Sequence, residues 1–295
     1  MVNYPRLTLS QQQDLPALIQ PASLIVAKFE DSTHQLWHCE TVDGSMVLKL
    51  CNHQTVQTST FWQAMNQLFD IDFPASLAHI DKTHNFLSEQ GELQIPDFIA
   101  AEASSFVLVR YLEGEDVDFE HVSDGIVTQL ARHLAKIHQS KYSHWGALHR
   151  AEFSSAQWST RLQNTLSSLA KVHPITIPED VLEQALQQAT ELNIETFVPI
   201  MLDLRWDQML HQQDQLSAIV DMDAFVIGPR ELELVLLEYQ LNEHQAALFA
   251  QAYQITTDWP DLTEQRLCYR LLLFLMNSLG ETDVKKWMNT AIRWR

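Results

Sequence analysis

The stretch PIMLDLRWDQML at residues 199–210, followed by IVDMD at residues 219–223, decides the fold of this chain. An apolar run leads into Asp203, a side-chain amide follows at Gln208, and a second apolar run leads into Asp221 and Asp223. Short apolar runs bounded by polar residues predict buried strands that end in loops. We therefore expect a rigid scaffold that presents these polar side chains at the ends of strands.

The hydrophobic pattern around this stretch changes once, near Tyr111. Before that point, the pattern predicts strands over 24–29, 35–41, 45–50, 95–101 and 106–111, and helices over 58–69 and 75–90. Asp43-Gly44 predicts a tight hairpin between two of these strands, because both residues tolerate a positive φ. We expect residues 1–111 to form a β-rich region.

Helical periodicity dominates after Tyr111. Ser123 or Asp124 can cap a helix whose apolar residues, from Ile126 to Ile137, fall on one face. Further helices are expected over 156–169, 178–192, 231–252 and 262–280, with a short β-like pair at 198–202 and 216–220. The sequence thus predicts an α+β fold, with a small β-rich N-terminal lobe (1–111) and a larger, mostly helical C-terminal lobe (112–295).

Composition excludes several functional classes. The chain has 295 residues, 46% of them hydrophobic, which is enough for substantial cores. Thirty-eight acidic residues against 19 basic ones give a formal net charge of -19. This charge repels phosphate backbones and anionic lipids, so we expect neither a nucleic-acid partner nor a membrane partner.

Cysteine usage and the N-terminal sequence indicate a cytoplasmic protein. Cys39, Cys51 and Cys268 lie far apart and form no pair with disulfide or zinc spacing. The N-terminus lacks the basic and apolar segments of a signal peptide, and the densest apolar run, 271–276, is too short to span a bilayer.

Residues 199–223 supply the groups that phosphoryl transfer needs. These groups are a carboxylate to orient the attacking hydroxyl, and oxygen ligands for Mg²⁺ on nucleotide phosphates. Asp203-Leu204 and Val220-Asp221 resemble the catalytic and metal segments of the aminoglycoside phosphotransferase and choline kinase branch of the protein-kinase-like fold, His-Gly-Asp-Leu-x-x-x-Asn and Ile-Asp. Three further features occur in the same order as in this branch. They are a lysine at Lys49 after Val47-Leu48, a hinge at 106–114 and a helix ending at 134–138.

Shorter motifs resemble the fructosamine (ketosamine) kinase subgroup of this superfamily. They are Gly228-Pro229 with the acidic helix that follows, Glu238, and Trp145-Gly146 with Trp158.

The resemblance implies an ATP- and Mg²⁺-dependent kinase that phosphorylates a hydroxyl of a small molecule. It implies that Lys49 contacts the nucleotide phosphates, Asp203 orients the acceptor hydroxyl and Asp221 binds Mg²⁺. Five further residues take secondary roles: Arg205 offsets charge on the transferred group, Gln208 and Asp223 extend the metal site, and Ser32 and Thr33 donate hydrogen bonds from the phosphate loop. Each also has an ordinary interpretation, since strand lysines, loop acids and surface ion pairs are common.

Several departures from the family pattern leave an alternative open. Met201-Leu202 replaces His-Gly, Gln208 replaces Asn, and the expected phosphate loop at 30–34 contains no glycine and includes Glu30. No glutamate occurs between Glu40 and Glu89 to pair with Lys49, and Asp81 is the nearest acidic candidate. A catalytically impaired, pseudokinase-like protein that binds a nucleotide or another ligand is therefore the alternative.

Two further features have competing interpretations. His138 lies on the apolar side of its helix, where a hydrogen-bonded structural histidine is the commoner explanation. The acidic cluster at 113–120 is either a solvated hinge or, with the negative charge of the whole chain, a source of attraction for a cationic acceptor such as an amine-bearing sugar or an aminoalcohol.

Overall fold

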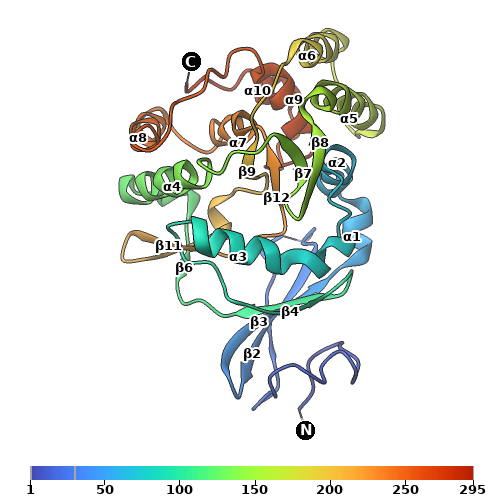
Figure 1. Ribbon diagram of the computed structural model, residues 1–295, viewed down its shortest axis with the longest axis vertical. Helices are drawn as coiled ribbons and strands as arrows, with labels where there is room; N and C mark the ends of the chain where they lie inside the picture. Colours follow the sequence, from blue (N-terminus) through green and yellow to red (C-terminus); the bar gives the residue numbers. More distant parts are fainter. Residues whose placement is uncertain (1, 30, 295) are drawn as a thin grey trace.

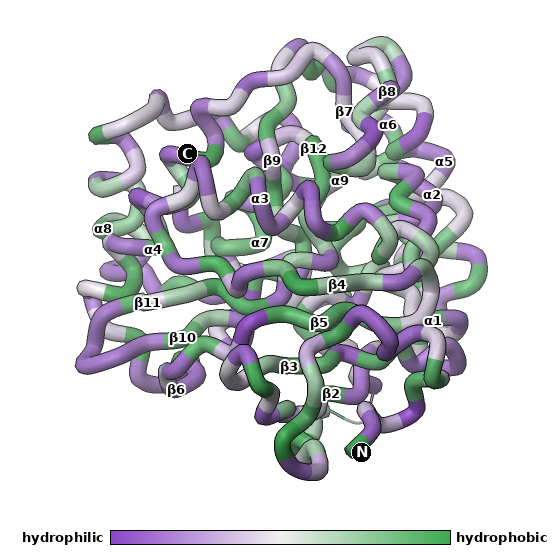
Figure 2. Tube along the Cα trace, turned by 60° about the horizontal axis from the view of Figure 1, so that its bottom comes forward, coloured by the Kyte–Doolittle hydropathy of each residue, from purple (hydrophilic) through white to green (hydrophobic). Residues whose placement is uncertain are grey.

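The computed structural model describes residues 2–29 and 31–294 and shows a β-rich N-terminal region and a helical C-terminal region, as expected (Figure 1). The N-terminal sheet has five antiparallel strands. Their order is β1 (Ser23–Ile25), β2 (His34–Thr41), β3 (Gly44–Cys51), β5 (Phe106–Arg110) and β4 (Phe98–Glu102). Figure 2 shows the hydrophobic run along β5, which packs with β3 over a small core containing Met46, Leu48 and Leu108.

The hairpin between β2 and β3 is confirmed. Thr41 pairs with Gly44, and Gly44 has a φ of 105°, a conformation that glycine adopts without steric cost. The expected first strand over 24–29 is wrong at its C-terminal end, because β1 stops at Ile25. Lys28 and Phe29 instead contact Asp116 and Arg205 of the C-terminal region.

Two short helices connect the N-terminal sheet to the C-terminal region. The expected helix over 58–69 corresponds to α2 (Thr60–Phe69), which Ser59 caps. A separate short helix that was not expected, α1 (His53–Thr58), precedes it. Nε of Arg161 donates to the carbonyl of Leu68 over 2.9 Å, and the ring of Phe69 lies 5.9 Å from that of Trp158. Residues early in the chain therefore pack against helices that follow much later.

The expected helix over 75–90 begins as a 3-10 turn, η1 (Ala75–His79), and continues as α3 (Ile80–Gln90). Helix α3 lies between the N-terminal sheet and the C-terminal region (Figure 1).

The C-terminal region is built from helices around one large hydrophobic core. They are α4 (Asp124–Ile137), α5 (Trp158–Val172), α6 (Glu179–Glu191), α7 (Arg230–Leu237), α8 (Glu243–Tyr253), α9 (Arg266–Leu275) and α10 (Val284–Met288), with 3-10 turns η2 (Phe119–His121), η3 (Ser155–Gln157) and η4 (Trp206–Gln208). In the part of the chain that the structure describes, no helix has the length and hydropathy needed to cross a membrane.

Two small sheets accompany these helices. One has the order β8 (Arg150–Ser154), β7 (His144–Ala147), β12 (Phe225–Gly228), β9 (Val198–Met201); the other has the order β11 (Gln215–Ile219), β10 (Met209–Gln212), β6 (Glu115–Asp116). The expected strands at 198–202 and 216–220 therefore belong to different sheets. The β7–β8 hairpin was not expected from the sequence.

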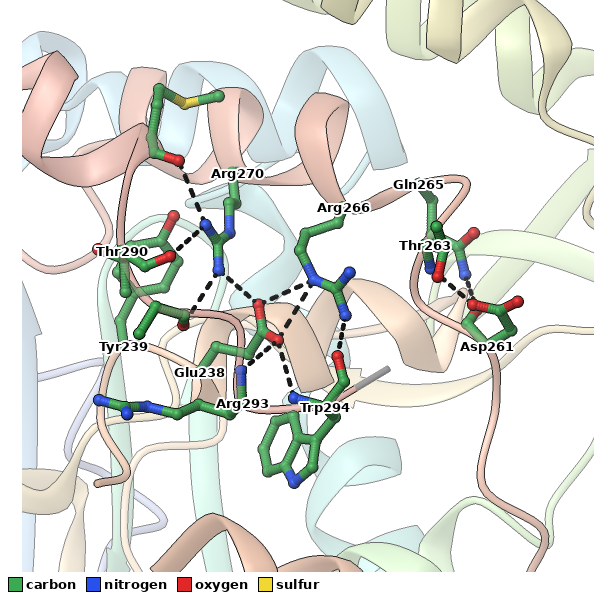
Figure 3. Close-up of polar contacts among 12 residues, drawn as sticks. Glu238, Tyr239, Asp261, Thr263, Gln265, Arg266, Arg270, Thr290, Arg293 and Trp294 are labelled. Atoms are coloured by element: carbon green, nitrogen blue, oxygen red, sulfur yellow. Dashed lines mark hydrogen bonds and ion pairs between the residues drawn. The ribbon is translucent and has the colours of Figure 1, made fainter. Parts of the chain in front are cut away.

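The expected helix over 231–252 is wrong, because the chain breaks between α7 and α8. Asn242 caps α8 through a capping box with Gln245. Just before the break, the fully buried Glu238 carboxylate accepts hydrogen bonds from Arg266 and Arg270 of α9 (Figure 3).

The same carboxylate anchors the C-terminal segment. Backbone N–H groups of Arg293 and Trp294 donate to Oε1 of Glu238 over 3.2 and 3.4 Å, and Arg270 donates to the carbonyl of Thr290 over 2.7 Å (Figure 3). This network joins α7, α9 and the C-terminal segment into one rigid unit.

Candidate active site

The polar side chains of residues 199–223 lie just after the ends of strands. Strand β9 ends at Met201, two residues before Asp203, and β11 ends at Ile219, two residues before Asp221. Both aspartates line a cavity of about 980 Å³ between the N-terminal sheet and the C-terminal region. Every other candidate site residue also lines this cavity: Ser32, Thr33, Lys49, Arg205, Gln208 and Asp223.

Lys49 is held by the carboxylates of Asp221 and Asp223. Its Nζ lies 2.5 Å from Oδ1 of Asp221 and 3.5 Å from Oδ2 of Asp223. Burial lowers the pKa of Lys49, but the two carboxylates outweigh burial and raise that pKa above its ordinary value. Burial raises the pKa of Asp221, and the ammonium of Lys49 outweighs it and lowers that pKa. Asp81 is not among the ion-pair partners of Lys49.

Two buried histidines lie near this ion cluster, and the sequence did not single them out. Nδ1 of His34 lies 3.5 Å from Oδ2 of Asp223, and Nδ1 of His84 shares a hydrogen bond of 2.7 Å with the carbonyl of Pro96. Burial lowers the pKa of both histidines, so both are neutral near pH 7. His34 lies opposite Cys51 in the sheet, two residues beyond Lys49 on β3, and this register is not apparent from the sequence alone.

Asp203 is positioned by its neighbours in the loop after β9. Nε of Arg205 lies 3.4 Å from Oδ1 of Asp203, and the amide nitrogen of Gln208 donates to Oδ2 over 3.4 Å. Burial raises the pKa of Asp203 to about 7, against the opposing effect of Arg205. A carboxylate with this pKa is matched to proton transfer near neutral pH.

Arg205 lies among three groups. Its guanidinium contacts Asp203 and also Asp207, with Nε of Arg205 3.2 Å from Oδ1 of Asp207. Its Cζ lies 5.0 Å from the ring centroid of Phe29, which precedes the expected phosphate loop. Arg205 is therefore held by two carboxylates and by the face of an aromatic ring.

The two residues before Glu30, Lys28 and Phe29, contact the C-terminal region across the cavity. Lys28 forms an ion pair with Asp116 of β6, and Phe29 stacks over Arg205. The hydroxyl of Ser32 donates to the carbonyl of His34 over 2.9 Å, so it is engaged within the loop. Glu30 lies outside the described residues.

The carboxylates of the site fit a magnesium ion that is bound together with a nucleotide. Asp223 is 8% exposed, and its Oδ2 has no hydrogen-bond partner among residues 2–29 and 31–294. No group of three or more His, Cys, Asp or Glu side chains with metal-binding geometry occurs in that same part of the chain. Mg²⁺ is commonly held by one or two carboxylates with water and phosphate oxygens, which is the set that Asp221 and Asp223 offer.

A buried polar chain holds the strand that precedes Asp203. Oε1 of Glu233 accepts a hydrogen bond of 2.6 Å from the backbone N–H of Met201, and Oε2 lies 2.9 Å from Nε2 of His138. Nδ1 of His138 shares a hydrogen bond of 2.7 Å with the hydroxyl of Tyr253. His138 is therefore a hydrogen-bonded structural histidine, as expected. The sequence did not predict this role of Glu233, because the position of Glu233 on its helix does not reveal that it contacts Met201 and His138.

The acidic cluster at 113–120 is divided by the fold. Glu115 and Asp116 line the cavity beside the hinge, and Asp116 is already paired with Lys28. Asp118 is exposed and pairs with His121, with 2.8 Å between its Oδ2 and Nδ1 of the histidine. Only part of the cluster therefore faces the site.

Comparisons with known proteins agree with this architecture. The profile of the phosphotransferase enzyme family matches residues 27–264. The macrolide 2'-phosphotransferase MphH from Brachybacterium faecium has a TM-score of 0.61 at 13% sequence identity, over 96% of this chain and 98% of its own. No match was found among curated proteins.

Two further solved structures are similar to this chain. A protein assigned as a fructosamine-3-kinase from Haemophilus somnus 129PT has a TM-score of 0.62 at 13% identity, over 95% of this chain and 94% of its own. The streptomycin–ATP ternary complex of APH(2")-IIa has a TM-score of 0.58 at 13% identity, over 98% and 99%. These likenesses confirm the expected protein-kinase-like fold.

Proposed function

Since this chain belongs to the phosphotransferase enzyme family, we propose that it transfers the γ-phosphoryl group of ATP to a hydroxyl of a small molecule. The observation that carries the proposal is the convergence of Lys49, Asp203 and Asp221 on one cavity, from three separate parts of the chain. The nucleotide lies between an N-terminal lobe, residues 1–111, and a C-terminal lobe, residues 112–295.

Lys49 and Asp221 form the nucleotide side of this site. The phosphates offer Lys49 an alternative anion, which frees oxygens of Asp221 and Asp223 for Mg²⁺. When bound, Mg²⁺ neutralises charge on the phosphates and holds them in place. Oδ2 of Asp223, which is buried and forms no hydrogen bond among the described residues but lies 3.5 Å from Lys49, supports this assignment.

Asp203 forms the acceptor side. Its carboxylate accepts the proton of the attacking hydroxyl, and its pKa of about 7 supports this role because a base near neutrality is both deprotonated and basic. Gln208 donates to Asp203, so we assign Gln208 to orienting that carboxylate and not to the metal. Arg205, held beside Asp203, offsets negative charge on the transferred group.

Calorimetric titration with ATP, with and without Mg²⁺, tests the nucleotide site. We expect magnesium-dependent binding that the Asp221→Ala variant loses by tenfold or more. The exposed Asp14, whose side chain forms no hydrogen bond or ion pair among the described residues, provides the matched control Asp14→Ala. No binding at millimolar ATP contradicts the proposal. Binding that is never followed by phosphoryl transfer favours the catalytically impaired alternative.

A further inference from the structure

The cavity has a hinge end and an opposite end, and strand β3 runs between them. Met46 pairs with Arg110, beside the hinge, whereas the backbone N–H of Cys51 donates to the carbonyl of Ser105 over 2.9 Å at the other end of the sheet. Lys49 lies near this second end, and the chain continues from Cys51 into α1 and α2. These helices therefore bound the cavity on the side away from the hinge.

Uncharged side chains line this opposite end, which we name the acceptor arm. Its residues come from α1, α2 and the turn after α9: Thr55, Thr58, Thr60, Phe61, Asn277 and Ser278. The hydroxyl of Thr60 donates to the carbonyl of Met276 over 3.3 Å and joins the two walls. The Glu238 network fixes α9, so the wall that presents Asn277 and Ser278 is rigid.

A buried side chain of the acceptor arm forms no hydrogen bond within the described part of the chain. Ser278 is 4% exposed, and its hydroxyl has no hydrogen-bond partner among the described residues. An unpaired buried hydroxyl costs free energy until a ligand or water satisfies it. Ser278 is thus a hydrogen-bonding group available to a molecule in the arm.

Charge is distributed unevenly along the cavity. Glu115 and Asp116 lie at the hinge end, where the base and ribose of a nucleotide belong in the proposed function, and Asp116 is paired with Lys28. Between the two ends, Asp221 forms an ion pair with Lys49, and Asp203 forms one with Arg205. Selection of an ammonium group requires a carboxylate placed for it. The six residues of the acceptor arm include no carboxylate, and Asp31, which also lines the cavity, belongs to the loop that precedes β2.

We infer that the acceptor is an uncharged, polyhydroxylated molecule, a sugar or polyol, bound in the acceptor arm. Its hydroxyls pair with Ser278, Asn277 and the threonines, and its C–H face packs on Phe61. One hydroxyl reaches Asp203. As its oxygen bonds to the γ-phosphorus, its proton passes to Asp203, the bond from phosphorus to the β,γ-bridging oxygen breaks, and ADP leaves with that electron pair. This inference rests on the proposed function and replaces the expected cationic acceptor.

Matched acceptor pairs test the inference at pH 7, where the amines are protonated. The pairs are glucose with glucosamine and fructose with 1-amino-1-deoxyfructose, alongside ribitol, choline and kanamycin, each with MgATP and the full-length chain. We expect at least one neutral compound to be phosphorylated with a kcat/KM tenfold or more above that of its amine partner, and choline and kanamycin to be inactive.

Two variants sharpen this test. Ser278→Ala should raise KM for the neutral acceptor about tenfold with little change in kcat or in ATP affinity, whereas Ser168→Ala, at an exposed position on α5, should change neither. Asn277→Asp keeps the side-chain shape and adds a carboxylate to the acceptor arm. It should shift the ratio of kcat/KM values at least fivefold toward the amine.

Each contrary outcome has a distinct meaning. Preference for the amine partners, in turnover that Asp203→Asn abolishes, overturns the inference and leaves the proposed function standing. Magnesium-dependent ATP binding with no neutral compound phosphorylated also overturns the inference. Absence of both ATP binding and turnover overturns the proposed function, and the inference with it.

Discussion

The Nζ atom of Lys49 lies 2.5 Å from Oδ1 of Asp221, although 172 residues separate them in the chain. Lys49 is 7% exposed, so each charge depends on the other for compensation inside the cavity. The pair links the N-terminal sheet to the loop after β11, and therefore couples the two halves of the site before any ligand binds.

Replacing Lys49 by Met should weaken both MgATP binding and the fold. The variant leaves Asp221 and Asp223 without their cation, and breaking a buried pair costs about 3 kcal/mol. Because the pKa of Asp221 is lowered in the folded state, the contribution of the pair is present above the unfolded pKa and is lost on acidification. Thermal melts should show the largest difference from wild type at pH 6–8 and a smaller one below pH 4. An equal difference at all pH values contradicts this explanation.

The pH dependence of kcat/KM should rise to a plateau with an apparent pKa near 7. Burial raises the pKa of Asp203 to about 7, and only its ionised form accepts the acceptor proton. Initial rates between pH 5 and pH 9, at constant ionic strength and saturating MgATP, measure this profile. A rate already constant at pH 5 would separate Asp203 from the proton transfer.

Replacing Arg205 by Gln should move the same profile toward higher pH. The guanidinium opposes the effect of burial on Asp203, so its removal raises the pKa of that carboxyl further. Turnover on the plateau should also fall about a hundredfold, because a charge close to the transferred group is lost. Lower turnover with an unchanged profile would mean that Arg205 does not act on Asp203.

Replacing Asp203 by Asn should abolish turnover and stabilise the fold at pH 8. The folded pKa of about 7 lies above the ordinary value of 3.8, so the folded state binds the proton more tightly than the unfolded state does. Stability from this group therefore falls as the pH rises from about 4 to about 7. The variant removes this loss and should gain about 2 kcal/mol at pH 8 and almost nothing near pH 4, as measured by urea unfolding.

Replacing Glu238 by Gln should destabilise the C-terminal region. The amide retains hydrogen-bonding atoms but leaves the buried guanidinium groups of Arg266 and Arg270 without a carboxylate (Figure 3). The expected cost is about 3 kcal/mol in denaturant unfolding. Glu89→Gln, at an exposed position on α3, is the matched control and should change stability little. An equal loss in both variants contradicts the role of the network.

Local patterns predicted much of the fold and several residues that line the cavity. Apolar runs before Asp203 and Asp221 predicted strand ends, Asp43-Gly44 predicted the hairpin, and the order of Lys49, hinge and catalytic segment indicated the fold that the comparisons confirm. These features depend on residues close together in the chain, or on their order alone.

Helix lengths were predicted less well. The run over 231–252 has a continuous helical pattern, but the chain breaks after α7, where Glu238 pairs with Arg266 and Arg270. The preference for this buried network outweighs local helix propensity, and it involves residues about 30 positions away.

By itself, the sequence determined that residues 199–223 form a strand-borne acidic site and that Lys49 precedes a hinge, because periodicity and order are local properties. Only the tertiary structure decided that Lys49 pairs with Asp221, that Glu233 accepts a hydrogen bond from the backbone of Met201, and that Ser278 lines the cavity. Those relationships depend on which distant segments exclude water together, and burial is also what raises the pKa of Asp203 to about 7.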